Sequence, residues 1–280
     1  MRQKRILTIQ DYSCLGRCST TVALPTISCA GIECVALPTA LLSNHTDYPS
    51  WTFFDLTDQI KPIAEKWKEF DHHFDAIYTG YLSTKQVGEV IALCKDYKEK
   101  DTLLFVDPAM ADWGKLYAGF GPEHVLEMRK LVALADLTKP NLTEACLLTG
   151  TPYPNEGKAP FSFYEEVAKK VHGLGAKVVI LSGLSSKEGK LGCLVYDGKE
   201  FSFFEGDREP GSYHGTGDLF SSALISAIVL GKTLLRSIEI AHRYIVTSIH
   251  ETLAHHQGGK IYGPMFEYAL PEFISLLREE

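Results

Sequence analysis

The feature of the sequence that most constrains its fold is a repeated alternation between short apolar runs and longer helical patterns. Some of the runs, such as Leu103–Val106 and Val178–Leu181, are continuously apolar, as strands buried on both faces should be. Strands that alternate with helices indicate βαβ units. The sequence therefore predicts an α/β fold with a mostly parallel central sheet and helices on both of its faces.

The same patterns place the elements along the chain. Strands are expected at Arg5–Gln10, Glu33–Pro38, Asp75–Thr79, Thr102–Val106, Leu137–Lys139, Lys177–Ser182, Leu191–Tyr196 and Phe201–Phe204. Helices are expected at Ser19–Cys29, Asp58–Phe70, Lys85–Lys100, Glu123–Leu134, Thr143–Leu148, Phe163–Leu174, Asp218–Leu230 and Leu234–Ala254. Asp197-Gly198 is a hairpin signal and predicts an antiparallel edge. Because no repeat or linker is visible, we expect one domain over residues 1–280.

Charge and composition limit the partners of the chain. The net charge of −7 argues against a nucleic-acid or anionic-membrane surface, which would need a basic stripe. The apolar run at Ile6–Ile9 is too short for a signal peptide, and no stretch approaches the roughly 18 apolar residues of a membrane span. The seven cysteines have irregular spacings that do not resemble a disulfide framework. These features predict a cytoplasmic protein with reduced thiols, and they do not exclude small anionic ligands, because backbone amides can hold a phosphate on an acidic protein.

The sharpest motif is Gly215-Thr216-Gly217-Asp218, which opens a helix rich in small residues. Glycines let the backbone approach a ligand closely, and the free amides of a first helical turn attract anions. Such a turn can hold a phosphoryl group during its transfer, and an aspartate there can accept the proton of an attacking hydroxyl. The alternative interpretation is an ordinary turn with an aspartate cap.

This motif resembles the signature of ribokinase-like kinases, and further segments are similar to those of the pyridoxal kinases among them. The similar segments follow successive predicted strands from Ile6 to Ser248, nearly the whole chain. They are Ser43-Asn44-His45-Thr46-x-Tyr48, Thr79-Gly80-Tyr81-Leu82, Asp107-Pro108-Ala109-Met110 with Asp112, and Pro140-Asn141-Leu142-Thr143-Glu144.

The resemblance implies a three-layer ribokinase-like fold, a homodimer and ATP-dependent phosphorylation of the 5′-hydroxyl of pyridoxal, pyridoxine or pyridoxamine. It implies Asp218 as general base, with Gly215, Thr216 and Gly217 forming an anion hole. It also implies Mg²⁺ held by Glu144 and Asp107, and a monovalent cation such as K⁺ near the phosphates. The implied nucleotide-binding residues are Asp107, Asp112, Lys139, Asn141 and Ser182, and the implied substrate-binding residues are Asp11, Thr46, Tyr81 and Tyr117.

Two positions depart from the pattern of the pyridoxal kinases. Asp11 follows Gln10 where those enzymes usually have serine, and a carboxylate there could accept a hydrogen bond from a protonated ring nitrogen or from the amine of pyridoxamine. Asp11 could equally cap the turn that leads into the next loop. Lys139 stands before Pro140-Asn141, which is similar to the sugar-kinase branch, in which a lysine points toward the nucleotide phosphates.

Several site residues also have plainer interpretations. Asp107 could end a strand in a turn, Glu144 could interact with a helix dipole, residues 44–46 could form a turn, and Tyr81 could be packing. The nearest rival function is a hydroxymethylpyrimidine kinase of the same superfamily. A non-catalytic vitamer-binding protein is the rival from another class. A dinucleotide-binding dehydrogenase is disfavoured because residues 14–18 lack the spaced glycines of its phosphate turn.

Overall fold

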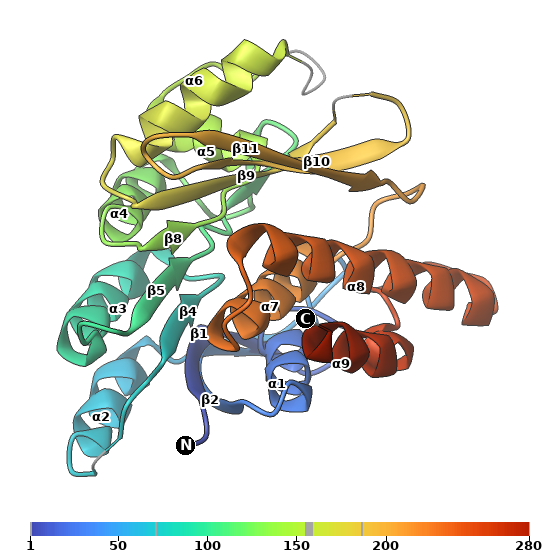
Figure 1. Ribbon diagram of the computed structural model, residues 1–280. Coiled ribbons are helices and arrows are strands. Elements are labelled where there is room, and N and C mark those ends of the chain that lie inside the picture. Colours follow the sequence, from blue (N-terminus) through green and yellow to red (C-terminus); the bar gives the residue numbers. More distant parts are fainter. Residues whose placement is uncertain (1, 71, 155–158, 186, 280) are drawn as a thin grey trace. The chain divides into compact units, whose positions relative to one another are not determined.

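The computed structural model describes residues 2–70, 72–154, 159–185 and 187–279 (Figure 1). The internal contacts of the chain group into two compact units. The first unit is formed by the chain up to Ala76 together with the chain from Arg208 onward, and the second is formed by Ile77–Asp207. A single domain over residues 1–280 stays a prediction.

Three strands, in the order β1-β2-β3, lie in the first unit. β1 (Arg5–Ser13) pairs in parallel with β2 (Glu33–Leu42), and β3 (Phe53–Asp55) pairs antiparallel with β2. Ile6, Leu7 and Ile9 of β1 have no exposed surface. Burying a side chain of this size stabilises a fold by about 1.5–3 kcal/mol. The apolar run at the start of the chain is therefore a core strand.

Helices from both ends of the sequence pack together in the first unit. Figure 1 shows α1 (Thr20–Cys29), α7 (Thr216–Val229), α8 (Leu234–His255) and α9 (Leu270–Arg278) as one group, with α7 in contact with α1 and α8. A 3₁₀ helix, Phe266–Ala269, precedes α9, and α2 (Thr57–Trp67) packs against β2. Residues 219–227 of α7 are all buried, as expected for a helix that is apolar on every side.

The second unit contains six strands of one sheet, in the order β11-β10-β9-β8-β5-β4. β5 and β9 both pair in parallel with β8, whereas β10 pairs antiparallel with β9 and with β11. Their bounds are Ala76–Thr79 (β4), Leu103–Val106 (β5), Leu137–Thr138 (β8), Val178–Leu184 (β9), Lys190–Tyr196 (β10) and Phe201–Asp207 (β11). A separate small hairpin joins β6 (Ala111–Asp112) to β7 (Lys115–Leu116).

Four helices accompany this sheet. They are α3 (Thr84–Tyr97), α4 (Pro122–Val132), α5 (Leu142–Thr149) and α6 (Phe161–His172). Helix α6 packs against β9 and β10, α5 packs against β9, and α4 contacts both α3 and α5. Val167, Ala168 and Val171 form the buried face of α6 at the three- and four-residue spacing of an amphipathic helix.

The predicted α/β fold is confirmed, including the parallel strands and the antiparallel edge at Asp197-Gly198. Every predicted strand and helix is present, and β1 extends to Ser13, three residues beyond its predicted end. Asp11 therefore lies inside a strand, and its alternative interpretation as a cap after the strand is wrong. The short strands β3, β6 and β7, the 3₁₀ helix and α9 were not predicted from the sequence.

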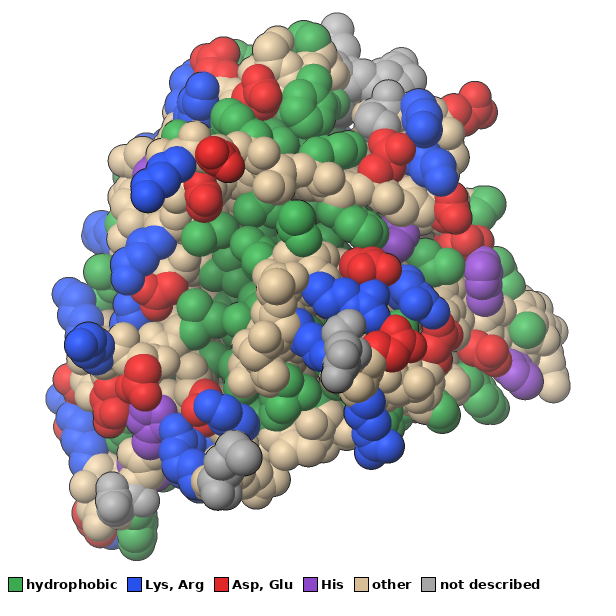
Figure 2. Space-filling model, viewed as in Figure 1, with side chains coloured by type: hydrophobic (Ala, Val, Ile, Leu, Met, Phe, Trp, Pro, Cys, Tyr) green, Lys and Arg blue, Asp and Glu red, His purple; other side chains and the backbone are tan. Residues whose placement is uncertain are grey.

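The surface of the protein carries charges of both signs, and its cysteines are unpaired. On the face that Figure 2 shows, basic and acidic side chains are interspersed. None of the helices that the structure describes is long and apolar enough to cross a membrane. All seven cysteines lie in the described part of the chain and are free thiols, with Cys14 exposed and Cys18, Cys94, Cys146 and Cys193 buried.

Candidate active site

The turn that opens α7 needs glycine at position 215 for two reasons. Gly215 has a φ of 81°, which side chains with a Cβ rarely adopt. A Cβ on Gly215 would also lie 2.0 Å from the carbonyl oxygen of Arg17, so the two backbones touch here. Gly217 has open space around its Cα, and the Thr216 hydroxyl donates to the Tyr213 carbonyl at 3.0 Å. The turn therefore presents backbone with little side-chain cover, as an anion site requires.

Asp218 is the acidic residue in the first turn of α7 and is half-buried. Its Oδ2 atom accepts a hydrogen bond from the backbone amide of Ser19 at 2.8 Å. A backbone amide that donates to a carboxylate stabilises the ionised form. The carboxylate is thus tied to the start of α1, which lies 199 positions away in the sequence.

Asp11 lies close to this aspartate through shared neighbours. It is 5% exposed, and its Oδ2 atom accepts from the Ser13 hydroxyl at 2.9 Å. Burial raises the pKa of Asp11, and the hydroxyls of Ser19 and Ser13 partly oppose that rise. Burial, followed by the charges of Asp11 and Asp218, raises the pKa of the Cys18 thiol. Within the described chain no lysine or arginine forms an ion pair with Asp11, so a ligand cation would be its natural partner.

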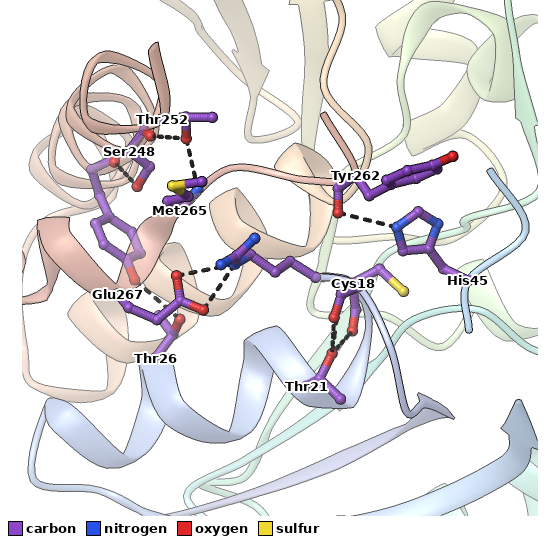
Figure 3. Close-up of polar contacts among 12 residues, drawn as sticks. Cys18, Thr21, Thr26, His45, Ser248, Thr252, Tyr262, Met265 and Glu267 are labelled. Carbon is purple, nitrogen blue, oxygen red and sulfur yellow. Dashed lines mark hydrogen bonds and ion pairs between the residues drawn. The ribbon is translucent and has the colours of Figure 1, made fainter. Parts of the chain in front are cut away.

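The Ser43–Tyr48 segment contributes a histidine to the wall beside α7. His45 is buried, and its ring stacks on that of His214 with centroids 4.2 Å apart. Its Nε2 atom lies 3.2 Å from the Tyr262 carbonyl oxygen (Figure 3). Burial lowers the pKa of His45 and lowers that of His214 to about 4, so both rings are neutral near pH 7. Thr46, by contrast, is exposed.

A pocket of about 250 Å³ adjoins these residues, and the sequence did not reveal all of its walls. It is lined by Leu15, Gly16, Arg17, Tyr48, Tyr262 and Glu267. The Arg17 Nε atom donates to Glu267 at 2.8 Å, the contact beside the Glu267 label in Figure 3. Tyr48 and Tyr262 stack with centroids 3.7 Å apart. Tyr262 and Glu267 belong to no recognisable motif, so only the folded chain reveals them.

In the second unit, Asn141 and Glu144 form a reciprocal cap at the start of α5. The Glu144 amide donates to Asn141 Oδ1 at 2.9 Å, and the Asn141 amide donates to Glu144 Oε2 at 2.8 Å. The other carboxylate oxygen of Glu144 accepts from the Met110 amide at 3.1 Å. The Asn141 side chain also donates to the Ala111 carbonyl at 2.8 Å. The two motif residues are therefore held rigidly beside the end of β5.

Lys139 and Asp107 form a buried ion pair next to this cap. Lys139 Nζ lies 3.1 Å from Asp107 Oδ2, and both side chains are less than a tenth exposed. Burial alone would lower the pKa of Lys139, but the charges of Asp107 and Glu144 raise it. Burial, followed by the charge of Asp107, raises the pKa of Glu144 to about 8. Two carboxyl groups share one ammonium group, so the cluster has room for another positive charge, and its oxygen donors suit Mg²⁺.

The remaining predicted residues of the second unit are spread around this cluster. Ser182 lies in β9, and its amide donates to the Pro140 carbonyl at 3.0 Å, next to Asn141. Asp112 lies on the β6–β7 hairpin and accepts from the Trp113 amide at 2.9 Å. Tyr81 is half-buried and stacks on Phe120, with centroids 5.4 Å apart. Tyr117 is 41% exposed.

A comparison of the sequence with known protein families identifies the family of the chain. The sequence profile of the phosphomethylpyrimidine kinase family matches residues 24–265. The chain belongs to this family. The match takes in the α7 turn with Asp218, the buried Asp107–Lys139 pair and the Asn141–Glu144 cap.

Two curated relatives of the chain have names that give different activities. A pyridoxine kinase of Bacillus subtilis is 33% identical over 73% of this chain and 70% of its own length. A hydroxymethylpyrimidine/phosphomethylpyrimidine kinase of Aquifex aeolicus is 28% identical over 87% of this chain and 93% of its own.

A solved structure extends the likeness to the fold. A Bacteroides thetaiotaomicron protein described as a phosphomethylpyrimidine kinase, crystallised with pyridoxal, is 34% identical over 97% of this chain and 96% of its own. The TM-score of 0.90 between the two structures confirms that the present chain has the predicted kinase fold.

Proposed function

We propose that the protein phosphorylates the 5′-hydroxyl of pyridoxal, pyridoxine and pyridoxamine with ATP, giving pyridoxal 5′-phosphate or its analogues. The observation that carries this proposal is Asp218, held as a hydrogen-bonded carboxylate in the first turn of α7 beside the bare Gly215–Gly217 backbone. The pyridoxal bound to the Bacteroides relative and the pyridoxine kinase name of the Bacillus relative support the substrate class.

In the proposed reaction the first unit handles the alcohol and the transferred group. Asp218 accepts the proton of the 5′-hydroxyl as that oxygen attacks the γ-phosphorus of ATP. The backbone of Gly215, Thr216 and Gly217 stabilises the negative charge that develops on the phosphoryl oxygens. Asp11 and Thr46 contact the vitamer. Its 5′-oxygen gains the phosphoryl group, ADP leaves, and no phosphoenzyme forms.

The second unit is proposed to hold the nucleotide. Glu144 and Asp107 would bind Mg²⁺, which neutralises phosphate charge. The raised pKa of Glu144 supports this role, because a bound cation would take the place of the proton that the buried carboxyl group otherwise holds. Lys139 and Asn141 would orient the phosphates, together with Asp112 and Ser182. Tyr81 and Tyr117 are proposed to contact the pyridine ring. A monovalent cation such as K⁺ near the phosphates is proposed from the resemblance alone.

We also propose a cytoplasmic homodimer. Tyr12, Leu41 and Phe54 are cross-strand neighbours on β1, β2 and β3, and they are 38%, 45% and 65% exposed. An edge strand with exposed apolar side chains favours association with another chain. We call this row of three side chains the β3 edge. We propose that it forms the dimer interface.

Hydroxymethylpyrimidine phosphorylation is the second candidate function, supported by the Aquifex relative. The Ser43–Tyr48 segment favours the vitamer activity instead, because it resembles the pyridoxal kinase pattern. An assay of ADP release with MgATP and each of pyridoxal, pyridoxine, pyridoxamine and hydroxymethylpyrimidine separates the two. Turnover confined to hydroxymethylpyrimidine would replace the proposed function with the rival.

Replacing Asp218 with asparagine tests the proposed base. Asp218→Asn keeps the shape of the side chain but removes its proton affinity, so kcat should fall by about 10²–10⁴-fold with little change in KM. Asp197→Asn, at the β10–β11 turn, is the matched control and should retain full activity. An Asp218→Asn enzyme with kcat within about tenfold of wild type would contradict the assignment.

A further inference from the structure

Ser19 has a backbone conformation that serine rarely adopts. Its φ is 47° and its ψ is −130°, and of the described residues other than glycine only Ser19 and Trp113 have positive φ. These angles are the mirror image of those of extended backbone. Glycine adopts them readily, whereas a residue with a Cβ rarely does. Ser19 is only 5% exposed, so solvent cannot explain the conformation. Strain of this kind persists where the surroundings enforce it, and it gathers at functional sites.

The Ser19 side chain also does not cap the helix that follows it. It is the residue that precedes α1, where a serine hydroxyl ordinarily accepts a hydrogen bond from a helix amide. In the described structure its side chain makes no such bond with α1. The hydroxyl lies near Asp11, where it partly opposes the rise that burial causes in the pKa of that carboxyl group. Both the backbone strain and the lost cap therefore need a compensating interaction.

The amide of Ser19 supplies that interaction. It donates to Asp218 Oδ2 at 2.8 Å, while the preceding residues pack against the turn that carries Asp218. The Arg17 carbonyl lies so close to Gly215 that a Cβ there would be 2.0 Å away. An amide cannot rotate as a side chain can, so the backbone conformation of Ser19 sets the direction of this donor. Rotating Ser19 to a negative φ would turn the amide away from its present partner.

We propose that Ser19 is a positioning residue that holds the Asp218 carboxylate through its backbone amide. The proposal rests on the proposed function, in which Asp218 is the base. The strained backbone of Ser19 is the conformation in which this amide points at Asp218. Ser19 thereby fixes the residue that removes the proton of the substrate.

Two substitutions separate the amide from the hydroxyl. Ser19→Ala and Ser19→Gly both remove the hydroxyl, but only glycine adopts the Ser19 conformation without strain. In Ser19→Ala the backbone at position 19 should relax and draw the amide away from Asp218. This should lower kcat by about tenfold or more. It should also move the acidic limb of the kcat/KM profile upward by about one pH unit. Ser19→Gly should keep that limb at its wild-type pH and retain most of kcat.

The comparison isolates Asp218 from the other titratable groups beside it. Asp11 loses the same hydroxyl in both variants, so its contribution cancels between them. The raised pKa of the Cys18 thiol keeps it out of the acidic range, and His45 and His214 are unaltered in both proteins. A role in stability alone would lower the melting temperature without moving the acidic limb.

A second measurement on folded wild-type protein guards against a variant that fails to fold. The ¹⁵N-resolved amide proton of Ser19 should shift with pH as Asp218 ionises. In Asp218→Asn this shift should shrink to the smaller part that the nearby Asp11 contributes. A flat Ser19 titration, or equal acidic limbs in the alanine and glycine variants, overturns the proposal. In that case vitamer turnover by wild type and its loss in Asp218→Asn would still uphold the proposed function. Absence of turnover in wild type would remove the function itself.

Discussion

Among the acidic residues that the structure describes in the first unit, Asp11 is a buried carboxyl group that forms no ion pair with lysine or arginine. Asp75, by contrast, pairs with Arg2 and Lys4, and although its burial raises the pKa, these hydrogen bonds lower it overall to about 2. Asp11 accepts a hydrogen bond from the Ser13 hydroxyl, and its burial raises the pKa. A positively charged substrate group would favour its ionised form. Asp11 is therefore suited to distinguish vitamers by charge.

Substitution of Asp11 by serine should change the preference among vitamers. Asp11→Ser removes the carboxylate that would meet the amine of pyridoxamine, so kcat/KM for pyridoxamine should fall by about tenfold relative to that for pyridoxal. Initial rates with the two vitamers measure this ratio, and Asp58→Ser on α2 is the control. Equal efficiency for both vitamers in wild type, unchanged in Asp11→Ser, would reject the idea.

Sequence distance decides which residues of the candidate site were predictable. Gly215 and Asp218, like Asn141 and Glu144, lie within four residues of each other, so a local motif captures each pair. Ser19 and Glu267 act through partners 199 and 250 positions away, and nothing in their local sequence marks them. Lys139 was expected near phosphates, and its buried pairing with Asp107 emerges only when β5 and β8 are aligned.

At the scale of elements, periodicity succeeded where segments were long enough to show it. The core strands are continuously apolar and were found, whereas β3 has three residues and β6 and β7 two each, too few for a pattern. Helix α9 did carry a readable signal, since Phe273, Leu276 and Leu277 form its buried face at helical spacing. This helix was therefore predictable from the sequence.

Helix α4 contains a histidine that should make the stability of the protein depend on pH. His124 is fully buried, stacks on Phe120 at 3.8 Å and lies 3.1 Å from the Thr84 hydroxyl through Nδ1. Burial lowers its pKa to about 4 from the ordinary 6.5. Between these values the unfolded chain binds the proton more readily than the folded protein does. The stability that His124 contributes is therefore complete above pH 6.5 and is lost as the pH falls toward 4.

His124→Phe tests this dependence. The variant retains an aromatic ring for Phe120 but cannot bind a proton, so the free energy of unfolding should fall less between pH 7 and about pH 5 than in wild type. Urea denaturation at both pH values gives the comparison, and carboxyl groups that titrate in this range affect both proteins equally. The same decrease in both proteins would show that His124 does not contribute to the acid sensitivity.

For the whole molecule, the β3 edge predicts the oligomeric state. Phe54→Asp places a charge in the middle of the exposed row and should convert a dimer into monomers, because burying an unpaired carboxylate at an interface is costly. Light scattering coupled to size-exclusion chromatography gives the mass directly. Phe70→Asp is a matched control, since Phe70 is 63% exposed and Phe54 65%. A monomeric wild type would refute the dimer, and a dimeric Phe54→Asp would refute this interface.

The division of the chain into two units has a consequence for biosynthesis. The second unit is one uninterrupted stretch, Ile77–Asp207, whereas the first needs both ends of the polypeptide. On the ribosome, β1 and β2 emerge early but must wait for α7, α8 and α9 before their helical cover exists. The interior segment can meanwhile form contacts within itself, because its contacts group into one compact unit. A messenger RNA truncated before the codon for Arg208 would therefore yield a chain that contains the whole second unit but only the N-terminal part of the first, without Asp218. Such a product would be a substrate for quality-control proteases.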